Sequence, residues 1–188
     1  MKSLPALLLL LPSLLSAERP LAVQGAVDSE LQPLLEALGR PPAREIDGYS
    51  FWEGRLEGRR VVVSRTEVGM VHAAVATTLL IREYAPELII NQGTAGAVNP
   101  DLQVGDIVIG TASVPFGAFR TRARPLGAGV DLDGWSPMPR RLRIGGERVA
   151  MERFPSDVDW VERVAKTAHP GGRVLRGVVG SADQWNRE

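Results

Sequence analysis

The sequence predicts an α/β layered fold with a mixed β-sheet. Apolar segments with strand-like and helix-like patterns follow one another in the order strand, helix, hairpin, helix, strand, strand, helix, strand. Hydrophobic residues make up 44% of the 188 residues and charged residues 23%, which is typical of a globular domain with a substantial core. These observations indicate one domain of ordinary size.

The first 17 residues are expected to be a leader rather than part of the fold. Lys2 precedes an apolar run over residues 4–15, which ends in the small residues Ser16 and Ala17. This pattern is typical of a secretory signal peptide, and the run is shorter than the about 20 residues of a membrane span. We therefore expect residues 18–188 to form the domain, in the periplasm or secreted, without a stable membrane anchor. An uncleaved anchor is the alternative, and a cytoplasmic location is less favoured.

The first half of the chain predicts two helices and three strands. Asp28 or Ser29 is expected to cap the first helix, and Pro86 to follow the end of the second. The expected elements are a strand at 21–25, a helix to about 38, strands at 50–56 and 60–65 joined by a turn near 57–58, and a helix at 69–84.

The second half is less regular. Strands are expected at 87–91 and 106–110, a helix at 156–168 with a serine cap, and a last strand at 174–179. Residues 111–155 are rich in Gly, Pro and Arg with little periodicity, so they predict a functional or interface loop with some local order.

The turn between the strands at 87–91 and 106–110 is the most informative feature. It reads Asn-Gln-Gly-Thr-Ala-Gly over residues 91–96, directly after an apolar strand. Glycines there let backbone N–H groups approach a ligand closely, and Thr94 offers a hydroxyl at the carboxyl end of a strand. Open α/β sheets bind small molecules at such an edge, so we expect a binding site here.

Composition excludes several other kinds of site. The formal net charge is zero, so no overall field attracts nucleic acid or an anionic membrane. The chain has no cysteine, and its two histidines, His72 and His169, are far apart without an acidic cluster at ligand spacing. We therefore expect no metal site and no cofactor.

Three segments together resemble the nucleoside phosphorylase/nucleosidase superfamily, and in particular the bacterial 5′-methylthioadenosine/S-adenosylhomocysteine nucleosidases. They are residues 25–30, residues 91–96 with 104–108, and residues 180–185. The resemblance extends over residues 21–188. It implies a three-layer α/β/α fold with a central mixed sheet, incomplete at the C-terminal end, because family members continue into a ribose-binding segment and a later acidic residue that protonates the purine.

The resemblance also implies roles for individual residues. Glu30 corresponds to the catalytic glutamate that engages the attacking water, although its position alone favours a solvated first-turn helix glutamate. Trp185 corresponds to the ring that stacks on adenine, and a core aromatic is the alternative. The remaining substrate-binding positions are Met70, Gly93, Thr94, Ala95, Gly96, Ser181, Asp183 and Gln184.

These correspondences imply hydrolysis of the N-glycosidic bond of adenine nucleosides, with an adenine nucleoside as the small-molecule partner. A phosphorylase would need arginines to hold phosphate, and residues 25–30 and 91–92 contain none, although Arg65 and Arg120 can reach in from elsewhere. A catalytically impaired nucleoside-binding remnant is the third possibility. The resemblance further implies a homo-oligomer, commonly a dimer, with residues 111–155 as the candidate contact or, alternatively, a lid.

Overall fold

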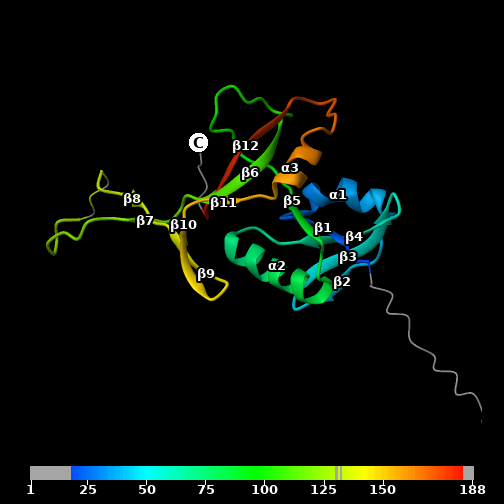
Figure 1. Cartoon of the computed structure of the whole chain (residues 1–188), viewed down its shortest axis with the longest axis horizontal. Helices are drawn as coiled ribbons and strands as arrows, with labels where there is room; N and C mark the ends of the chain where they lie inside the picture. Colours follow the sequence, from blue (N-terminus) through cyan, green and yellow to red (C-terminus); the bar gives the residue numbers. More distant parts are fainter. Residues whose placement is uncertain (1–17, 130, 132, 184–188) are drawn as a thin grey trace, which may run out of the picture. The chain divides into compact units, whose positions relative to one another are not determined.

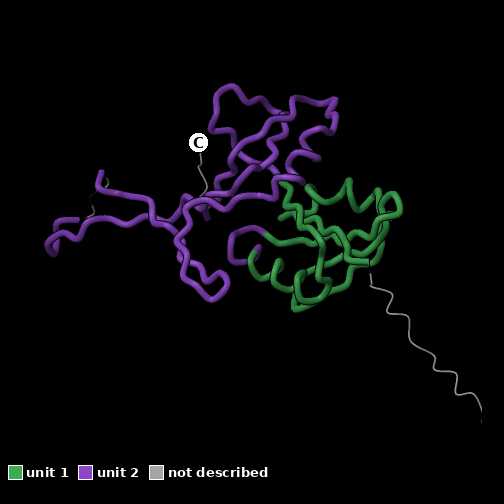
Figure 2. Tube along the Cα trace, viewed as in Figure 1, with its two compact units in different colours: residues 1–67, 74–93 green, residues 68–73, 94–188 purple. Residues whose placement is uncertain are grey.

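The computed structural model describes residues 18–129, 131 and 133–183, and the expected leader lies outside them. The fold is α/β with mixed sheets, as the sequence predicts. Contacts group the described chain into two compact units (Figure 2), which we take in turn. Unit 1 holds residues 18–67 and 74–93, and unit 2 holds residues 68–73 and 94–183.

Unit 1 contains a five-stranded mixed sheet. Strand β1 is parallel to both β4 and β5, whereas β2, β3 and β4 form an antiparallel meander. In spatial order the strands are β2 (Arg44–Ile46), β3 (Tyr49–Leu56), β4 (Arg59–Arg65), β1 (Leu21–Gly25) and β5 (Leu88–Asn91). The predicted hairpin is confirmed as β3 and β4, and sequence analysis missed the short strand β2.

Helices α1 (Asp28–Ala37) and α2 (Met70–Tyr84) cover opposite faces of this sheet (Figure 1). Successive side chains of a strand point to opposite faces, so β4 serves both layers. Val62 packs with Leu80 of α2, whereas Val61 and Val63 pack with Leu31 of α1. Leu31 and Leu80 are fully buried, and each such burial contributes about 1.5–3 kcal/mol. The three-layer α/β/α arrangement is therefore present in unit 1.

The predicted cap of α1 is wrong. The N-cap is Val27, whose side chain cannot accept a hydrogen bond, and Asp28 is already the first helical residue. The carboxylate of Glu30 takes over this role, because it accepts hydrogen bonds from the backbone N–H groups of Ala26 at 2.8 Å and Val27 at 3.4 Å. Glu30 thus fixes the turn between β1 and α1.

Unit 2 is built on a three-stranded sheet of β6 (Ile107–Pro115), β12 (Val174–Ser181) and β11 (Phe154–Pro155). Strand β12 is parallel to β6, and β11 is antiparallel to it. The strands predicted at 106–110 and 174–179 are confirmed and run further than expected. They pair with each other within the sheet of unit 2.

Two predictions for the second half need correction. Residues 111–155 are not a single irregular loop, because β6 continues to Pro115 and two hairpins follow. Their strands are β7 (Phe119–Arg120), β8 (Ser136–Pro137), β9 (Arg140–Ile144) and β10 (Glu147–Met151).

The helix predicted at 156–168 is the shorter α3 (Val158–Val164), capped by Asp157 rather than Ser156. Val161 is the buried residue of α3, so further turns would gain little packing.

Asp106 holds the loop before β6 to Arg173, the residue that precedes β12. Its carboxylate accepts hydrogen bonds from the guanidinium of Arg173 and from the backbone N–H groups of Arg173 at 2.9 Å and Gln103 at 3.0 Å. The Asp106 side chain is only 6% exposed. The hydrogen bonds from the Arg173 side chain, and then those from the two backbone N–H groups, hold the pKa of the Asp106 carboxyl far below its usual value.

This pKa shift predicts a pH-dependent loss of stability. The folded-state pKa lies below the unfolded value of about 4, so the stabilisation is complete above that value and is lost as the pH falls below it. Asp106→Asn is expected to lower the melting temperature at pH 7 by at least about 5 °C and to flatten its fall below pH 4. Thermal unfolding across this pH range measures both effects. Asp101→Asn, in the same loop, is the control, and equal behaviour of the two variants would refute the assignment.

Candidate active site

The site predicted from the sequence begins where β1 and β5 end. These strands are neighbours and parallel, so the segments that follow Gly25 and Asn91 leave the sheet at one edge. The backbone N–H of Gln92 donates to the carbonyl of Gln24 at 2.9 Å, and the Gln92 side chain donates to the carbonyl of Glu30 at 2.8 Å. Gln92 therefore links the carboxyl ends of β1 and β5 to the first turn of α1 by hydrogen bonds.

Gly93 lies directly against the carboxylate of Glu30. A Cβ atom placed on Gly93 would stand 2.8 Å from Glu30 Oε1 and 3.2 Å from the carboxyl carbon. Real Cβ atoms essentially never stand so close, so a side chain at position 93 would displace the carboxylate, which is the far end of a flexible side chain. Two predicted site residues that lie 63 positions apart in the sequence are thus brought together in unit 1.

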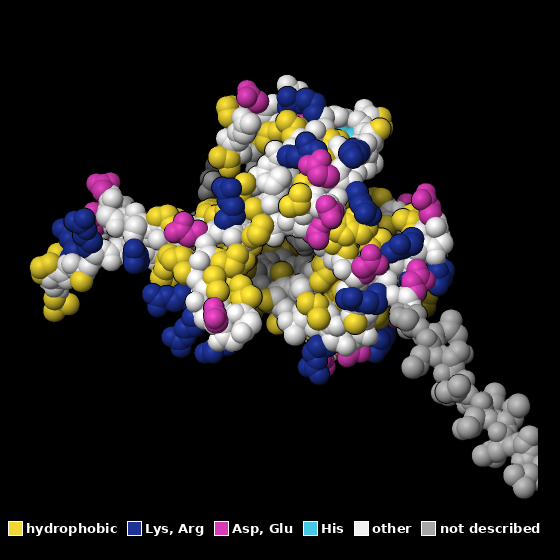
Figure 3. Space-filling model, viewed as in Figure 1, with side chains coloured by type: hydrophobic (Ala, Val, Ile, Leu, Met, Phe, Trp, Pro, Cys, Tyr) yellow, Lys and Arg dark blue, Asp and Glu magenta, His cyan; other side chains and the backbone are white. Residues whose placement is uncertain are grey.

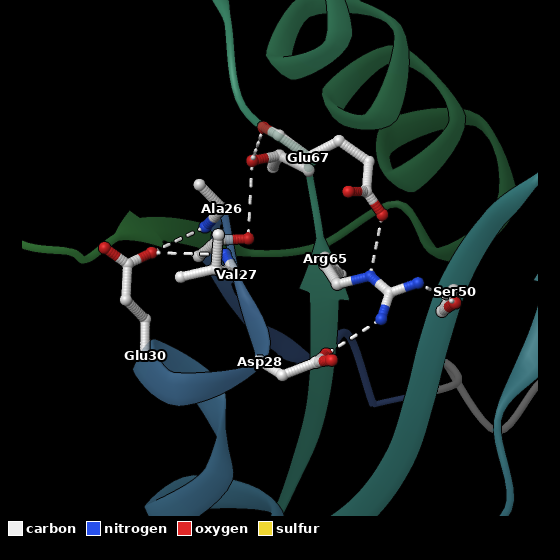
Figure 4. Close-up of polar contacts among 9 residues, drawn as sticks. Ala26, Val27, Asp28, Glu30, Ser50, Arg65 and Glu67 are labelled. Atoms are coloured by element: carbon white, nitrogen blue, oxygen red, sulfur yellow. Dashed lines mark hydrogen bonds and ion pairs between the residues drawn. The ribbon is translucent and has the colours of Figure 1, made fainter.

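Figure 4 shows how Glu30 is held at this edge. Its half-buried side chain turns back toward the N–H groups of Ala26 and Val27, which are dipoles pointing at the carboxylate. The arrangement fixes a carboxylate at the carboxyl end of β1, where it can accept a proton from a water molecule.

The remaining described site residues belong to unit 2. Thr94, Ala95 and Gly96 follow Gly93 in an exposed segment without regular structure. No atom lies within 4 Å of a Cβ placed on Gly96, so internal packing does not require glycine there. This open space agrees with the predicted close approach of a ligand to the backbone, which stays a prediction.

Met70 and Asp183 are brought together within unit 2. Asp183 follows β12, and its Oδ1 atom accepts a hydrogen bond of 2.8 Å from the backbone N–H of Met70, the first residue of α2. Asp183 therefore caps α2, a role that the sequence did not predict. Ser181 ends β12 and is exposed, and its carbonyl accepts the N–H of Phe116 at 3.1 Å. Gln184 and Trp185 lie outside the described residues, so the stacking role of Trp185 is untested.

Comparison with known proteins assigns the chain to a family. The family model described as the phosphorylase superfamily matches residues 20–188. The chain belongs to the phosphorylase superfamily. Its members include nucleosidases, so the chain is related to enzymes that act on glycosidic bonds.

Three relatives illustrate this membership. A 5′-methylthioadenosine/S-adenosylhomocysteine nucleosidase of Shewanella pealeana is 45% identical over 89 residues, covering 47% of this chain and 39% of the relative. The corresponding Neisseria meningitidis nucleosidase, in complex with methylthio-immucillin-A, matches with a TM-score of 0.67 and 32% identity, over 88% of this chain and 65% of that chain. A futalosine hydrolase of Helicobacter pylori, at 19% identity and a TM-score of 0.66, shares the fold, covering 90% of this chain and 70% of that chain.

The two arginines that could serve a phosphorylase differ in their surroundings. Arg65 at the end of β4 donates to Asp28 and Glu67 at 2.8 Å each and to Ser50 at 3.4 Å (Figure 4). The hydrogen bond that Arg65 donates to Asp28 raises the pKa of the Arg65 guanidinium, and the negative charge of Glu67 raises it further. Two carboxylates thus offset the guanidinium charge, which leaves Arg65 poorly suited to phosphate. Arg120 lies on β7 in unit 2 and donates to Ser136 at 3.2 Å.

Sequence analysis missed Gln24, a buried polar residue of β1 that directly precedes the turn carrying the site. Gln24 is 2% exposed on β1, and its side-chain oxygen accepts a hydrogen bond of 3.0 Å from Thr77 of α2. This hydrogen bond ties α2 to the strand that carries the site, whereas the buried side-chain nitrogen of Gln24 has no hydrogen-bond partner among the described residues. The signal was present, because Gln24 is the polar residue of an otherwise apolar strand and directly precedes Gly25.

Proposed function

We propose that the protein hydrolyses the N-glycosidic bond of adenine nucleosides of the methylthioadenosine or S-adenosylhomocysteine type. The products are adenine and a thio-ribose. The observation that carries the proposal is the Glu30 carboxylate, held by two backbone N–H groups against Gly93 at the carboxyl end of parallel strands. The named nucleosidase relatives support the substrate class.

The Glu30 carboxylate assists the attack of water on the sugar. As the bond between ribose and adenine breaks, its electron pair leaves with the base and positive charge develops on the sugar. Glu30 accepts a proton from the attacking water, and its negative charge offsets that of the sugar. The Thr94 hydroxyl and the backbone after Gly93 are proposed to bind the sugar. Protonation of adenine is assigned by the resemblance to a later acidic residue, and the chain covers 65% of the Neisseria nucleosidase.

Water rather than phosphate is the proposed nucleophile. Phosphate needs fixed cations that it can share in bidentate hydrogen bonds. Arg65 is the arginine at the end of β4, and its guanidinium already bonds two carboxylates. A purine nucleoside phosphorylase is therefore the less favoured alternative.

The proposal is tested by adenine release from methylthioadenosine, with and without inorganic phosphate. We expect release that is independent of phosphate and accompanied by free methylthioribose, both followed by chromatography. Release that requires phosphate and yields a ribose-1-phosphate would establish the phosphorylase. Calorimetric binding of methylthioadenosine without any release would establish a nucleoside-binding remnant, and neither binding nor release would refute the proposed function altogether.

A further inference from the structure

Buried polar side chains are few in the described part of the chain. Figure 3 shows Arg, Lys, Asp and Glu side chains dispersed over the visible surface, in contact with solvent. The polar residues that are buried are Gln24, Ser50, Ser64 and Thr66, all in unit 1. Two of them have partners within the chain, because Ser50 accepts a hydrogen bond from Arg65 at 3.4 Å and Thr66 donates to a backbone carbonyl at 3.3 Å. Gln24 and Ser64 therefore need a separate explanation.

Gln24 and Ser64 each hold a buried polar atom that the described residues do not satisfy. The side-chain nitrogen of Gln24 and the hydroxyl oxygen of Ser64 have no hydrogen-bond partner there, although Ser64 is fully buried and Gln24 nearly so. Burying such a group unpaired destabilises a fold by more than an ordinary hydrogen bond stabilises it. Native proteins therefore carry few such groups, and an ordered water molecule is a common partner for them.

The two unsatisfied atoms lie on the same side of the five-stranded sheet. Gln24 of β1 and Ser64 of β4 are directly paired in the parallel ladder, so their side chains point to the same face. This is the face that α2 covers, because the side chain of Gln24 is hydrogen-bonded to Thr77 of α2 at 3.0 Å. Neighbouring strands lie about 4.8 Å apart, and a water molecule that makes two hydrogen bonds of about 2.8 Å joins atoms at about this separation.

Short side chains face each other at this level of the interface between the sheet and α2. Leu80 of α2 packs with Val62, two residues before Ser64. Because α2 starts close to the carboxyl end of β4, the residue one helical turn before Leu80 lies nearer that end, and this residue is the fully buried Ala76. A helical turn advances about 5.4 Å and two strand residues about 6.6 Å, so Ala76 lies near the level of Ser64 and Gln24. Alanine and serine leave space there for a small molecule.

We propose that Gln24 Nε2 and Ser64 Oγ bind an internal water molecule between the five-stranded sheet and α2. The amide nitrogen of Gln24 only donates hydrogen bonds, so its partner must be an acceptor, which excludes a cation. An anion is excluded because burying a charge is far more unfavourable than burying a neutral group. Water accepts from the amide, either donates to the hydroxyl or accepts from it, and remains neutral. Such a site does not depend on the proposed reaction.

The sign of one stability change tests the water site. With the water bound, Ser64→Ala removes one of its two partners, so the melting temperature of the full chain is expected to fall by about 3–6 °C. Without a water, the same substitution removes an unpaired buried hydroxyl, and the melting temperature should rise. A rise, or a change within about 1 °C, would overturn the proposal. Ser50→Ala calibrates the measurement, because Ser50 is a buried serine of the same sheet whose partner is Arg65.

A double-mutant cycle separates the water from the packing of the serine itself. Gln24→Met keeps the length of the side chain and removes its amide, so the water loses its other partner. In this background Ser64→Ala is expected to lower the melting temperature by less than about half as much as in the unaltered chain. Equal falls in the two backgrounds would assign the loss to packing around Ser64 and would contradict the proposal.

A crystal structure of the full chain tests the position of the water directly. We expect an ordered water oxygen at about 2.7–3.2 Å from both Gln24 Nε2 and Ser64 Oγ. A water bonded to only one of these atoms or to neither, or a direct hydrogen bond between the two side chains, would refute the site.

Discussion

Replacing Glu30 with glutamine is expected to slow adenine release by about 10²–10⁴-fold with little change in KM, because a positioned proton acceptor typically contributes that much. Glutamine keeps a side-chain oxygen that can accept the N–H of Ala26, so the turn between β1 and α1 should persist. What is lost is the negative charge that accepts the proton from water and offsets the charge of the sugar. Steady-state kinetics with methylthioadenosine measure the effect, and thermal unfolding checks the fold.

Glu36→Gln is the matched control for this substitution. Glu36 is on the same helix, but at its exposed C-terminal end, where its carboxylate binds Arg40 at 2.6 Å. The same chemical change there is expected to leave the rate within about twofold, since exposed ion pairs contribute little. If Glu30→Gln were as active as Glu36→Gln, Glu30 would be only a helix-terminus residue, which is the alternative that its position allows.

The sequence predicted unit 1 well because its signals are local. Alternating apolar residues, Gly25 and the turn at Glu57 and Gly58 each act within a few residues, and the packed core agrees with them. The helix cap was wrong because two competing signals were present. Asp28 and Ser29 are good caps by type, but the Glu30 carboxylate at the third helical position already binds the preceding N–H groups.

The hairpin β9–β10 was missed although its signal was available. Gly145 and Gly146 both have positive φ, at 58° and 90°, and a Gly-Gly pair between two strands is a typical two-residue turn. Residues 141–144 of β9 do alternate between arginine and apolar residues, but β10 does not, so the alternation was too short to indicate a hairpin.

The site could be predicted only as far as neighbouring residues determine it. The glycines were found from their place after an apolar strand, and Glu30 from the resemblance to the family, but the contact between Gly93 and Glu30 depends on the parallel pairing of β1 with β5. The capping of α2 by Asp183 likewise joins residues 113 positions apart. No local pattern contains such pairings, so they had to come from the structure.

Gly93→Ala is expected to reduce adenine release by about 10²-fold while leaving the melting temperature within a few degrees. The new methyl group would stand 2.8 Å from Glu30 Oε1, so one of the two must move. The carboxylate is the end of a rotatable side chain and moves more easily than the backbone, so the cost in stability is small. A displacement of about 1 Å at a reacting group can cost about 100-fold in rate. Steady-state kinetics of this variant measure the loss of rate, and thermal unfolding of the same variant measures the cost in stability.

A double-mutant cycle identifies the cause of that loss. If alanine at position 93 acts by displacing the Glu30 carboxylate, then the same substitution in a Glu30→Gln background has little left to remove. The two losses should therefore be strongly non-additive, with the double variant within about threefold of Glu30→Gln alone. Losses that multiply independently would mean that Gly93 serves the substrate directly, through the close approach of its backbone. The cycle thus distinguishes a glycine that makes room for the carboxylate from one that makes room for the nucleoside.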